Sequence, residues 1–291
     1  MTPALEARAD AGVPGTREFP FSAEQFRVIS ERIYAFAGIR LVEAKREMVY
    51  ARLVRRLRAL GIGSFDDYIR FLELEPAEWE HCTNALTTNV TAFYREAHHF
   101  DILGQHAAAA HPVEPYRVWS AGCSTGEEPY TIAMCLSEAL PGGGFEVMAS
   151  DLDTQVLAHA REGVYPVEAV KSLPEERQRR FFLRGTGRQE GRARVRREVA
   201  AHVEFLRVNL MDERWPVQPG FDAIFCRNVM IYFDKPTQRR LVERFAQHLR
   251  SRGLFFAGHA ESLLDSGHRF RLRGQTVYEL IDRPAGAGRG A

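Results

Sequence analysis

The residues VWSAGCSTGEEP, numbers 118–129, contain a strand pattern, a tight glycine turn and the beginning of a helix. Pro129 suits the first turn of that helix, where a backbone N–H group is not needed. A second strand pattern, FEVMASD at 145–151, follows the helix, and strands and helices go on alternating toward the end of the chain. This alternation predicts an α/β domain whose mostly parallel sheet has helices on both faces and right-handed connections.

The later part of the chain continues this pattern. Further strands are predicted at 203–210, 221–228, 253–259 and 275–281. Helices are predicted at 127–140, 154–165 and 236–253, with Gly253 closing the last of them. Residues 184–205 interrupt the order with a glycine-rich run and an alternating Arg194-Val195-Arg196, which together predict a small antiparallel β-subdomain inserted in the α/β domain.

The chain before this domain reads as helical. Ser22 and Ser64 stand where helix N-caps are expected, and Gly38 and Gly61 stand where helices should stop. We therefore predict an all-helical domain at 19–84 and a linker helix at 85–98 that contributes to the active site. The α/β domain follows at 99–283, with the subdomain at 184–205, and residues 1–18 and 284–291 read as flexible tails.

The composition is that of an ordinary globular protein. Apolar residues make up 45% of the 291 residues and charged residues 26%, with a net charge of +1. The sequence has no apolar run long enough for a membrane span and no signal-peptide pattern at its start. Its four cysteines form no C-x-x-C pair, which favours a reducing, cytoplasmic location without disulfides or structural zinc.

The turn at 118–129 has the chemistry of a nucleoside site without a phosphate cradle. It matches neither the G-x-G-x-x-G pattern of dinucleotide sites nor a phosphate loop. Glu127 and Glu128 would repel a phosphate but can hold an ammonium group, and Asp151 at the end of the next strand can accept hydrogen bonds from a ribose. S-adenosylmethionine combines these features, although the turn is also compatible with plain strand–helix geometry, and Asp153 suits a helix N-cap.

Two other polar segments are candidates for the same site. Arg227 and Asn228 follow a predicted strand and should lie beside the ligand crevice, while Tyr232 can point into the crevice or pack in the core. The segment NALTTNVTAFYREAHHF at 84–100 places Arg95 near the domain junction. Its adjacent histidines, His98 and His99, cannot both face one metal ion from a helix, so no metal is predicted.

The predicted second helix has a basic face. Arg52, Arg55 and Arg56 recur at i, i+3 and i+4. A solvated face is the ordinary explanation for such a run, and an acidic partner surface is the functional one.

Taken together, the motifs closely resemble those of the chemotaxis receptor methyltransferases, the CheR family. The resemblance runs from about residue 21 to 283 and is carried, in order, by LTTNVTAFYRE, VWSAGCSTGEEPY, ASDLD, RGTGRQEG, FDAIFCRNVMIYFDKPTQ and GLFFAGHAESL. It implies a Rossmann-like, S-adenosylmethionine-dependent methyltransferase domain with a β-subdomain, preceded by an all-α domain.

The resemblance also implies site residues and partners. It implies that the cofactor site is lined by Asn89, Thr91, Arg95, Glu128, Asp151, Asn209, Leu210, Cys226, Arg227 and Asn228. Arg95 and Tyr232 are expected closest to the reacting methyl group. The acidic methylation region of a receptor should meet Arg52, Arg55 and Arg56, and a tethering peptide from the receptor C-terminus should dock near Gly187, Gly191, Arg194 and Arg196.

The implied reaction is the formation of glutamate methyl esters on membrane-bound chemotaxis receptors, with S-adenosylhomocysteine as the second product. We expect a monomer that acts without a metal and does not bind nucleic acid. Three alternatives remain open: a nucleic-acid methyltransferase, although RNVMIYF lacks the prolines of amino-methylating enzymes; a non-catalytic receptor-binding module; and an NAD-dependent dehydrogenase, which the missing glycine pattern disfavours.

Overall fold

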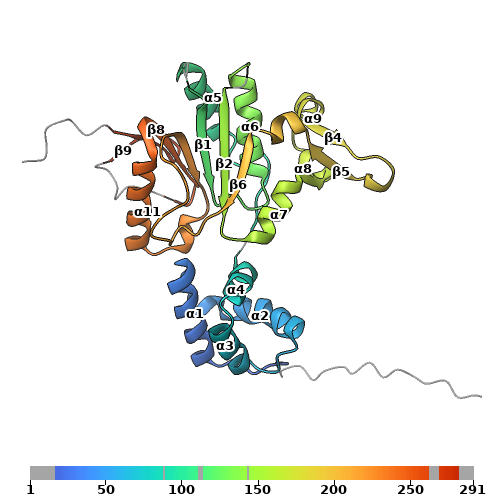
Figure 1. Cartoon of the computed structure of the whole chain (residues 1–291), viewed down its shortest axis with the longest axis vertical. Helices are drawn as coiled ribbons and strands as arrows, with labels where there is room; N and C mark the ends of the chain where they lie inside the picture. Colours follow the sequence, from blue (N-terminus) through green and yellow to red (C-terminus); the bar gives the residue numbers. More distant parts are fainter. Residues whose placement is uncertain (1–16, 88, 111–113, 143, 262–268, 282–291) are drawn as a thin grey trace, which may run out of the picture.

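The structure is a computed structural model and describes residues 17–87, 89–110, 114–142, 144–261 and 269–281. Its first helices form an N-terminal bundle, which lies below the α/β domain in Figure 1. They are α1 (Ala23–Ala37), α2 (Arg46–Leu60), α3 (Phe65–Leu74) and α4 (Glu78–Leu86), with a 3-10 turn, η1 (Glu43–Lys45), before α2. Their apolar faces pack into a separate core, as expected for a small all-helical domain.

Local signals account for the helix ends in this bundle. The Ser22 hydroxyl accepts from the N–H of Gln25 at 3.1 Å, and the Gln25 side chain accepts from the N–H of Ser22 at 2.8 Å, which completes a capping box. Gly38 ends α1 with a φ of 69°, and Ser64 caps α3 through the N–H of Asp67. The predicted helix starts and stops at these positions are confirmed.

The linker is not the helix predicted at 85–98. α4 ends at Leu86, residues 89–92 belong to no helix or strand, residues 93–97 form a turn, and α5 (His98–Ala110) begins only at His98. Tyr94 and Glu96 have positive φ angles of 53° and 58°, which a helix cannot contain. Contacts distant in sequence stabilise the turn: the Tyr94 N–H donates to Oγ1 of Thr131, and Arg227 donates to the carbonyl oxygen of Arg95.

The α/β domain has a seven-stranded sheet in the order β6-β2-β1-β7-β8-β10-β9. The first five of these strands are parallel neighbours, and β10 and β9 are antiparallel, which confirms the mostly parallel sheet. The strands are β1 (Tyr116–Ala121), β2 (Phe145–Asp151), β6 (Val203–Arg207), β7 (Phe221–Cys226), β8 (Leu249–Ala257), β9 (Phe270–Gly274) and β10 (Val277–Leu280). Because β2 and β7 lie on opposite sides of β1, the strand order reverses at β1 and opens a crevice there.

Helices cover both faces of this sheet. On one face, α5 and α6 (Glu127–Ala139) pack against side chains such as Val118 and Phe225. On the other face, α11 (Lys235–His248) packs against Trp119 and Phe255, which alternate with the first set along the strands. Figure 1 shows α11 beside β8, away from α5 and α6.

Two helices end earlier than predicted. α7 (Thr154–Glu162) stops at Gly163, which has a φ of 60°, and the following residues form β3 (Val164–Pro166). α11 ends at His248, and Gly253 lies inside β8 instead of closing a helix. A Cβ on residue 253 would lie 2.9 Å from the carbonyl oxygen of Arg250, so glycine is needed there for a close backbone approach within the strand.

The β-subdomain begins and ends earlier in the chain than predicted. Its antiparallel sheet has the order β3-β5-β4 and combines β3 with β4 (Phe182–Arg184) and β5 (Arg192–Val195). The predicted boundaries of 184–205 are therefore wrong, because β3 pairs with β5 across about thirty residues and β6 joins the main sheet. The short elements between them are α8 (Val167–Val170), α9 (Glu175–Phe181), η2 (Gly187–Gln189) and α10 (Arg197–Ala200). Figure 1 shows this small sheet projecting from the side of the domain.

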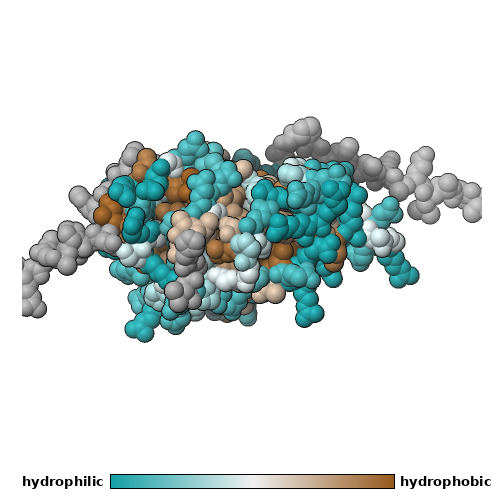
Figure 2. Space-filling model, turned by 90° about the horizontal axis from the view of Figure 1, so that it is seen from above, coloured by the Kyte–Doolittle hydropathy of each residue, from teal (hydrophilic) through white to brown (hydrophobic). Residues whose placement is uncertain are grey.

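The surface is mainly hydrophilic on the face shown in Figure 2, with smaller apolar areas between. No helix in the described ranges is long and apolar enough to cross a membrane. Of the two predicted tails, residues 1–16 and 284–291 lie outside the described residues, while Glu18 pairs with Arg58 of α2.

Candidate active site

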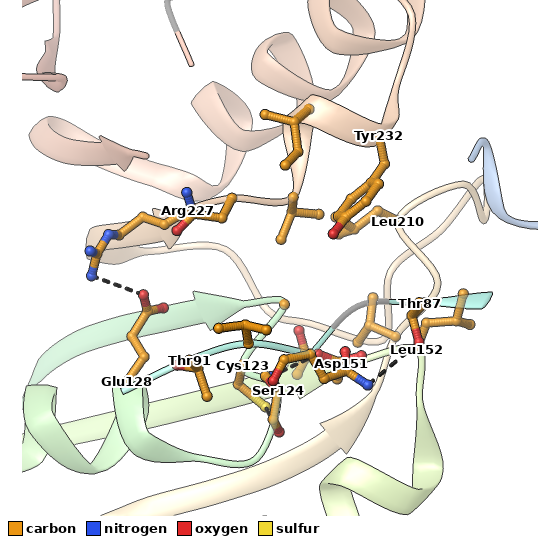
Figure 3. A pocket seen from close by; sticks show the side chains of 18 of the residues that line it. Thr87, Thr91, Cys123, Ser124, Glu128, Asp151, Leu152, Leu210, Arg227 and Tyr232 are labelled. Carbon is orange, nitrogen blue, oxygen red and sulfur yellow. Dashed lines mark hydrogen bonds and ion pairs between the residues drawn. The ribbon is translucent and has the colours of Figure 1, made fainter. Parts of the chain in front are cut away.

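A cavity of about 290 Å³ lies at the carboxyl ends of β1, β2 and β7, where the strand order reverses. Residues from the N-terminal domain, the linker and the α/β domain all line it. Figure 3 shows Tyr232, from the 3-10 turn η3 (Met230–Tyr232), across the cavity from Asp151 and Ser124. Ligands of open α/β sheets bind at such a reversal, so this cavity is the candidate active site.

The turn after β1 forms one wall of the cavity. The Ser124 N–H donates to Oδ2 of Asp151 at 2.8 Å, and the N–H of Asp153 donates to Oδ1 at 3.0 Å. A Cβ on residue 122 would lie 2.3 Å from Cγ2 of Val229, so only glycine allows the turn after β1 and the turn after β7 to approach so closely. Burial raises the pKa of the Asp151 carboxyl above its ordinary value, and the backbone N–H groups oppose that rise.

Glu128 and Arg227 form a buried ion pair at the cavity. Nη1 of Arg227 lies 3.1 Å from Oε2 of Glu128, and its Nη2 lies 3.1 Å from Oε2 of Glu96. The other oxygen of Glu128 accepts from the Ser120 hydroxyl at 2.7 Å. Burial raises the pKa of Glu128 above its ordinary value. Burial also acts to raise the pKa of Glu96, but the positive charge of Arg227 and a hydrogen bond from the His259 backbone outweigh it, so the pKa of Glu96 is below its ordinary value.

The structure brings nearly all the residues predicted for the cofactor site and for catalysis to this one cavity. It is lined by Asn89, Thr91, Arg95, Glu128, Asp151, Asn209, Leu210, Arg227, Asn228 and Tyr232. Cys226 is the exception, because its side chain is fully buried and does not line the cavity. Cys226 is the last residue of β7, and its side chain packs in the apolar layer under α11.

Several predicted residues also make structural contacts. The Asn209 side chain donates to the carbonyl oxygen of Phe36 at 2.7 Å and thereby joins the two domains. Asn89 donates to Oδ2 of Asp153 at 3.1 Å, and Asp153 caps α7 as predicted. Nη1 of Arg95 donates to the carbonyl oxygen of Val90 at 2.8 Å, which fixes the guanidinium at the cavity.

Sequence reasoning missed some residues at the site. Ala37 and Ile39 bring the N-terminal domain into the cavity wall, and the N–H of Arg40 donates to the carbonyl oxygen of Tyr232 at 2.9 Å. Glu96 is the second carboxylate on Arg227, and its only signal in the sequence is its position beside Arg95. Contacts between residues far apart in the chain carry no local pattern that would have revealed them.

The basic face of α2 is smaller than predicted. Arg56 donates two hydrogen bonds to the carboxylate of Glu78, which is almost fully buried, and Arg52 donates to the carbonyl oxygens of Leu86 and Thr87 at the end of α4. Arg55 is exposed. Two of the three arginines therefore stabilise the N-terminal domain, whatever else they bind.

The described residues contain no group of three or more His, Cys, Asp or Glu side chains arranged to hold a metal ion. The strand order, the glycine turn and a cavity lined by Asp151, Glu128, Arg95 and Arg227 define a Rossmann-like α/β protein, whose cavity lies where such folds bind nucleosides.

Comparison with known proteins narrows that class. Residues 89–279 match the family described as CheR methyltransferase, SAM binding domain, and residues 24–87 match CheR methyltransferase, all-alpha domain. The chain is 53% identical over 269 residues to the chemotaxis protein methyltransferase of Salmonella typhimurium, covering 91% of this chain and 93% of that protein. It is 51% identical over 269 residues to chemotaxis protein methyltransferase 2 of Pseudomonas aeruginosa, with 91% and 95% covered.

The chain therefore belongs to the CheR family of S-adenosylmethionine-dependent chemotaxis protein methyltransferases.

Proposed function

We propose that this methyltransferase esterifies glutamate side chains in the cytoplasmic region of chemotaxis receptors, giving glutamate methyl esters and S-adenosylhomocysteine. The observation that carries the proposal is the composition of the cavity. It combines carboxylates suited to a ribose and an ammonium group, Asp151 and Glu128, with a guanidinium suited to a substrate carboxylate, that of Arg95. The family membership supports the reaction class, and the relatives are chemotaxis proteins by name.

The residues present fit the cofactor. Each oxygen of Asp151 accepts one backbone N–H and keeps a further lone pair for a ribose hydroxyl. Glu128 at the start of α6 presents a carboxylate to an ammonium group, and the Arg227 charge beside it suits the carboxylate of an amino acid. When bound, S-adenosylmethionine supplies a methyl group activated by its sulfonium charge.

The substrate carboxylate needs no general base. A glutamate side chain has a pKa near 4.3 and is ionised at neutral pH, so catalysis rests on holding it in line in a site with little water. We assign this positioning to Arg95, which pairs with the carboxylate, and to Tyr232, whose hydroxyl donates to a carboxylate oxygen. The Lys45 ammonium lies 5.5 Å from the Tyr232 ring centroid and adds positive charge beside the place where the carboxylate enters.

Apolar side chains surround the opening of the cavity. Val90 and Ile231 line the cavity yet are 75% and 50% exposed, so they stand where it meets solvent. When a glutamate on a receptor helix enters the cavity, side chains three or four residues away on the same helix face lie at the opening of the cavity. We therefore assign these two residues to the contact with apolar side chains that flank the methylated glutamate.

Replacing Val90 or Ile231 with serine is expected to raise KM for receptor about tenfold, because burial of such side chains contributes about 1.5–3 kcal/mol and 1.4 kcal/mol corresponds to a factor of ten. The affinity for S-adenosylhomocysteine should not change. Leu74→Ser and Leu272→Ser are matched controls, since these side chains are 76% and 56% exposed and lie away from the cavity. Equal KM values for the cavity variants and the controls would contradict the assignment.

Two further surfaces suit an extended receptor contact. Arg55 on α2 is exposed and suits an acidic helix, together with those faces of Arg52 and Arg56 that remain accessible. In the β-subdomain, β3 and β4 are the edge strands of the small sheet, and Gly187, Gly191 and Arg194 are exposed near them. A receptor peptide added as a further strand would pair with the free backbone N–H and C=O groups of such an edge. Arg196 lies directly after β5, between that strand and α10.

The experiment that tests the proposed function is transfer of labelled methyl groups from S-adenosylmethionine into membranes that contain chemoreceptors. We expect label in the receptor band, released as methanol by mild base, as a glutamate ester requires. Label in nucleic acid would favour the nucleic-acid alternative, and cofactor binding without any transfer would favour a non-catalytic receptor-binding module.

A further inference from the structure

Glu261 is a buried carboxylate held by backbone amides. It follows β8, is 5% exposed, and no cationic side chain pairs with it in the described part of the chain. Its Oε2 accepts from the N–H of Asn228 at 2.9 Å and from the N–H of Gly258 at 2.6 Å, and its Oε1 accepts from the N–H of Ile231 at 3.2 Å. One side chain thus satisfies backbone donors from the ends of two neighbouring strands, β7 and β8.

The donors belong to the turn that carries Tyr232. Residues 228–232 leave β7 with a φ of 60° at Asn228 and then form η3. Asn228, Ile231 and Tyr232 of this turn all line the cavity. A residue at positive φ is held there by its surroundings, and here the carboxylate of Glu261 binds the amide of that residue directly.

Gly258 makes this arrangement possible. A Cβ on residue 258 would lie 2.6 Å from Nδ2 of Asn228 and 2.9 Å from Oε2 of Glu261. The two strand ends therefore meet at van der Waals distance only because residue 258 has no side chain. Burial raises the pKa of Glu261, and the three amide hydrogen bonds oppose that rise and stabilise the ionised form.

We propose that Glu261 is a positioning residue for methyl transfer, whose carboxylate fixes the 228–232 turn and thereby holds the Tyr232 hydroxyl at the cavity. This inference rests on the role proposed above for Tyr232. Only an ionised carboxylate, with two oxygens and no donor, fits the three N–H groups. A glutamine would turn its own N–H₂ toward one of them and loosen the turn without removing any side chain from the cavity.

The test compares Glu261→Gln with Glu279→Gln. Glu279 is matched in type and burial, being 6% exposed, but it binds Arg252 and Arg271 on β8 and β9, away from the cavity. We expect Glu261→Gln to lower kcat about tenfold to a hundredfold, as misplacement of a catalytic group does. Amide hydrogen exchange in peptides covering 227–233 should rise in this variant, and Glu279→Gln should show neither change.

A double-mutant cycle separates positioning from general destabilisation. In a Tyr232→Phe background, Glu261→Gln should lower kcat less than about twofold, because the group that it positions is gone. An equal loss in both backgrounds, unchanged exchange at 227–233, or an effect no larger than that of Glu279→Gln would overturn the proposal. Should Glu261→Gln not fold, Glu261→Asp replaces it, since the shorter side chain keeps the charge but cannot reach all three amides.

Failure of the proposed function is recognised separately in the same experiment. If the unaltered protein forms no ester on receptor membranes, the assignment of the substrate is wrong. The exchange measurement, made on the protein with and without S-adenosylhomocysteine, still decides whether Glu261 holds the turn.

Discussion

Replacement of Arg227 with methionine is expected to lower the free energy of unfolding by about 3–5 kcal/mol, the usual loss when one partner of a buried ion pair is removed. The Arg227 side chain is almost inaccessible and lies between the carboxylates of Glu96 and Glu128. Methionine of similar length would fill much of the space but leave both carboxylates without their arginine partner. Urea unfolding followed by circular dichroism measures the loss.

The loss should depend on pH in a defined direction. Burial already raises the pKa of Glu128 above its ordinary value, and Arg227 limits that rise, so the pKa of Glu128 should be higher still in the methionine variant. A carboxyl whose pKa is higher in the folded state binds protons more readily when the protein is folded. The free energy of unfolding then falls as the pH rises above the pKa that the carboxyl has in the unfolded state. The difference from the unaltered protein should therefore be larger at pH 8 than at pH 5.

Arg32→Met is the matched control for this prediction. Arg32 pairs with Glu73, and both side chains are substantially exposed, so its removal should change stability by less than about 1 kcal/mol at either pH. Equal losses of unfolding free energy in the two variants would contradict the prediction, as would a loss in Arg227→Met that does not vary with pH. Either result would mean that the ion pairs of Arg227 with Glu96 and Glu128 do not stabilise the protein.

Replacement of Asp151 with asparagine is expected to weaken binding of S-adenosylhomocysteine by at least about a hundredfold. Both carboxylate oxygens already accept a backbone N–H, from Ser124 and from Asp153. The N–H₂ group of asparagine would face one of these donors, so the variant loses an anchor of the β1 turn together with an acceptor for the ribose. Two hydrogen bonds to a charged group, at about 1.5–3 kcal/mol each, account for this magnitude.

Isothermal titration calorimetry with S-adenosylhomocysteine measures the effect directly. Asp222→Asn is a suitable control, because Oδ2 of Asp222 also accepts a backbone N–H, from Arg117 at 2.8 Å, but lies at the amino end of β7. Its affinity should stay within about threefold of the unaltered protein. Wild-type affinity in Asp151→Asn, or equal losses in both variants, would remove Asp151 from the cofactor site.

The parts of the fold that local chemistry controls could be read from the sequence. The strand, glycine turn and helix at 118–129, the caps at Ser22, Ser64 and Asp153, and the acid at the end of β2 each depend on a few neighbouring residues. Because parallel strands end at one edge of a sheet, residues that follow different strands could be expected at one cavity. The position of Arg227 and Asn228 beside that cavity follows from this rule.

The errors fall where distant contacts override local pattern. The linker has good helix-forming residues around Arg95 and Glu96, yet bonds to Thr131 and Arg227 hold it in a turn. The sequence pattern misplaces the start of the β-subdomain, because its first strand, β3, follows α7 directly and pairs with a segment much later in the chain. No local pattern around Arg56 predicts that its partner is Glu78, a buried glutamate on another helix.

The measurement that most directly tests the account is a crystal structure of the protein with S-adenosylhomocysteine at saturating concentration. We predict electron density for the ligand in the cavity at the ends of β1, β2 and β7, with the ribose hydroxyls on Asp151 and the amino-acid end near Glu128 and Arg227. An empty cavity at saturation, or density for the ligand at another place on the molecule, would contradict it.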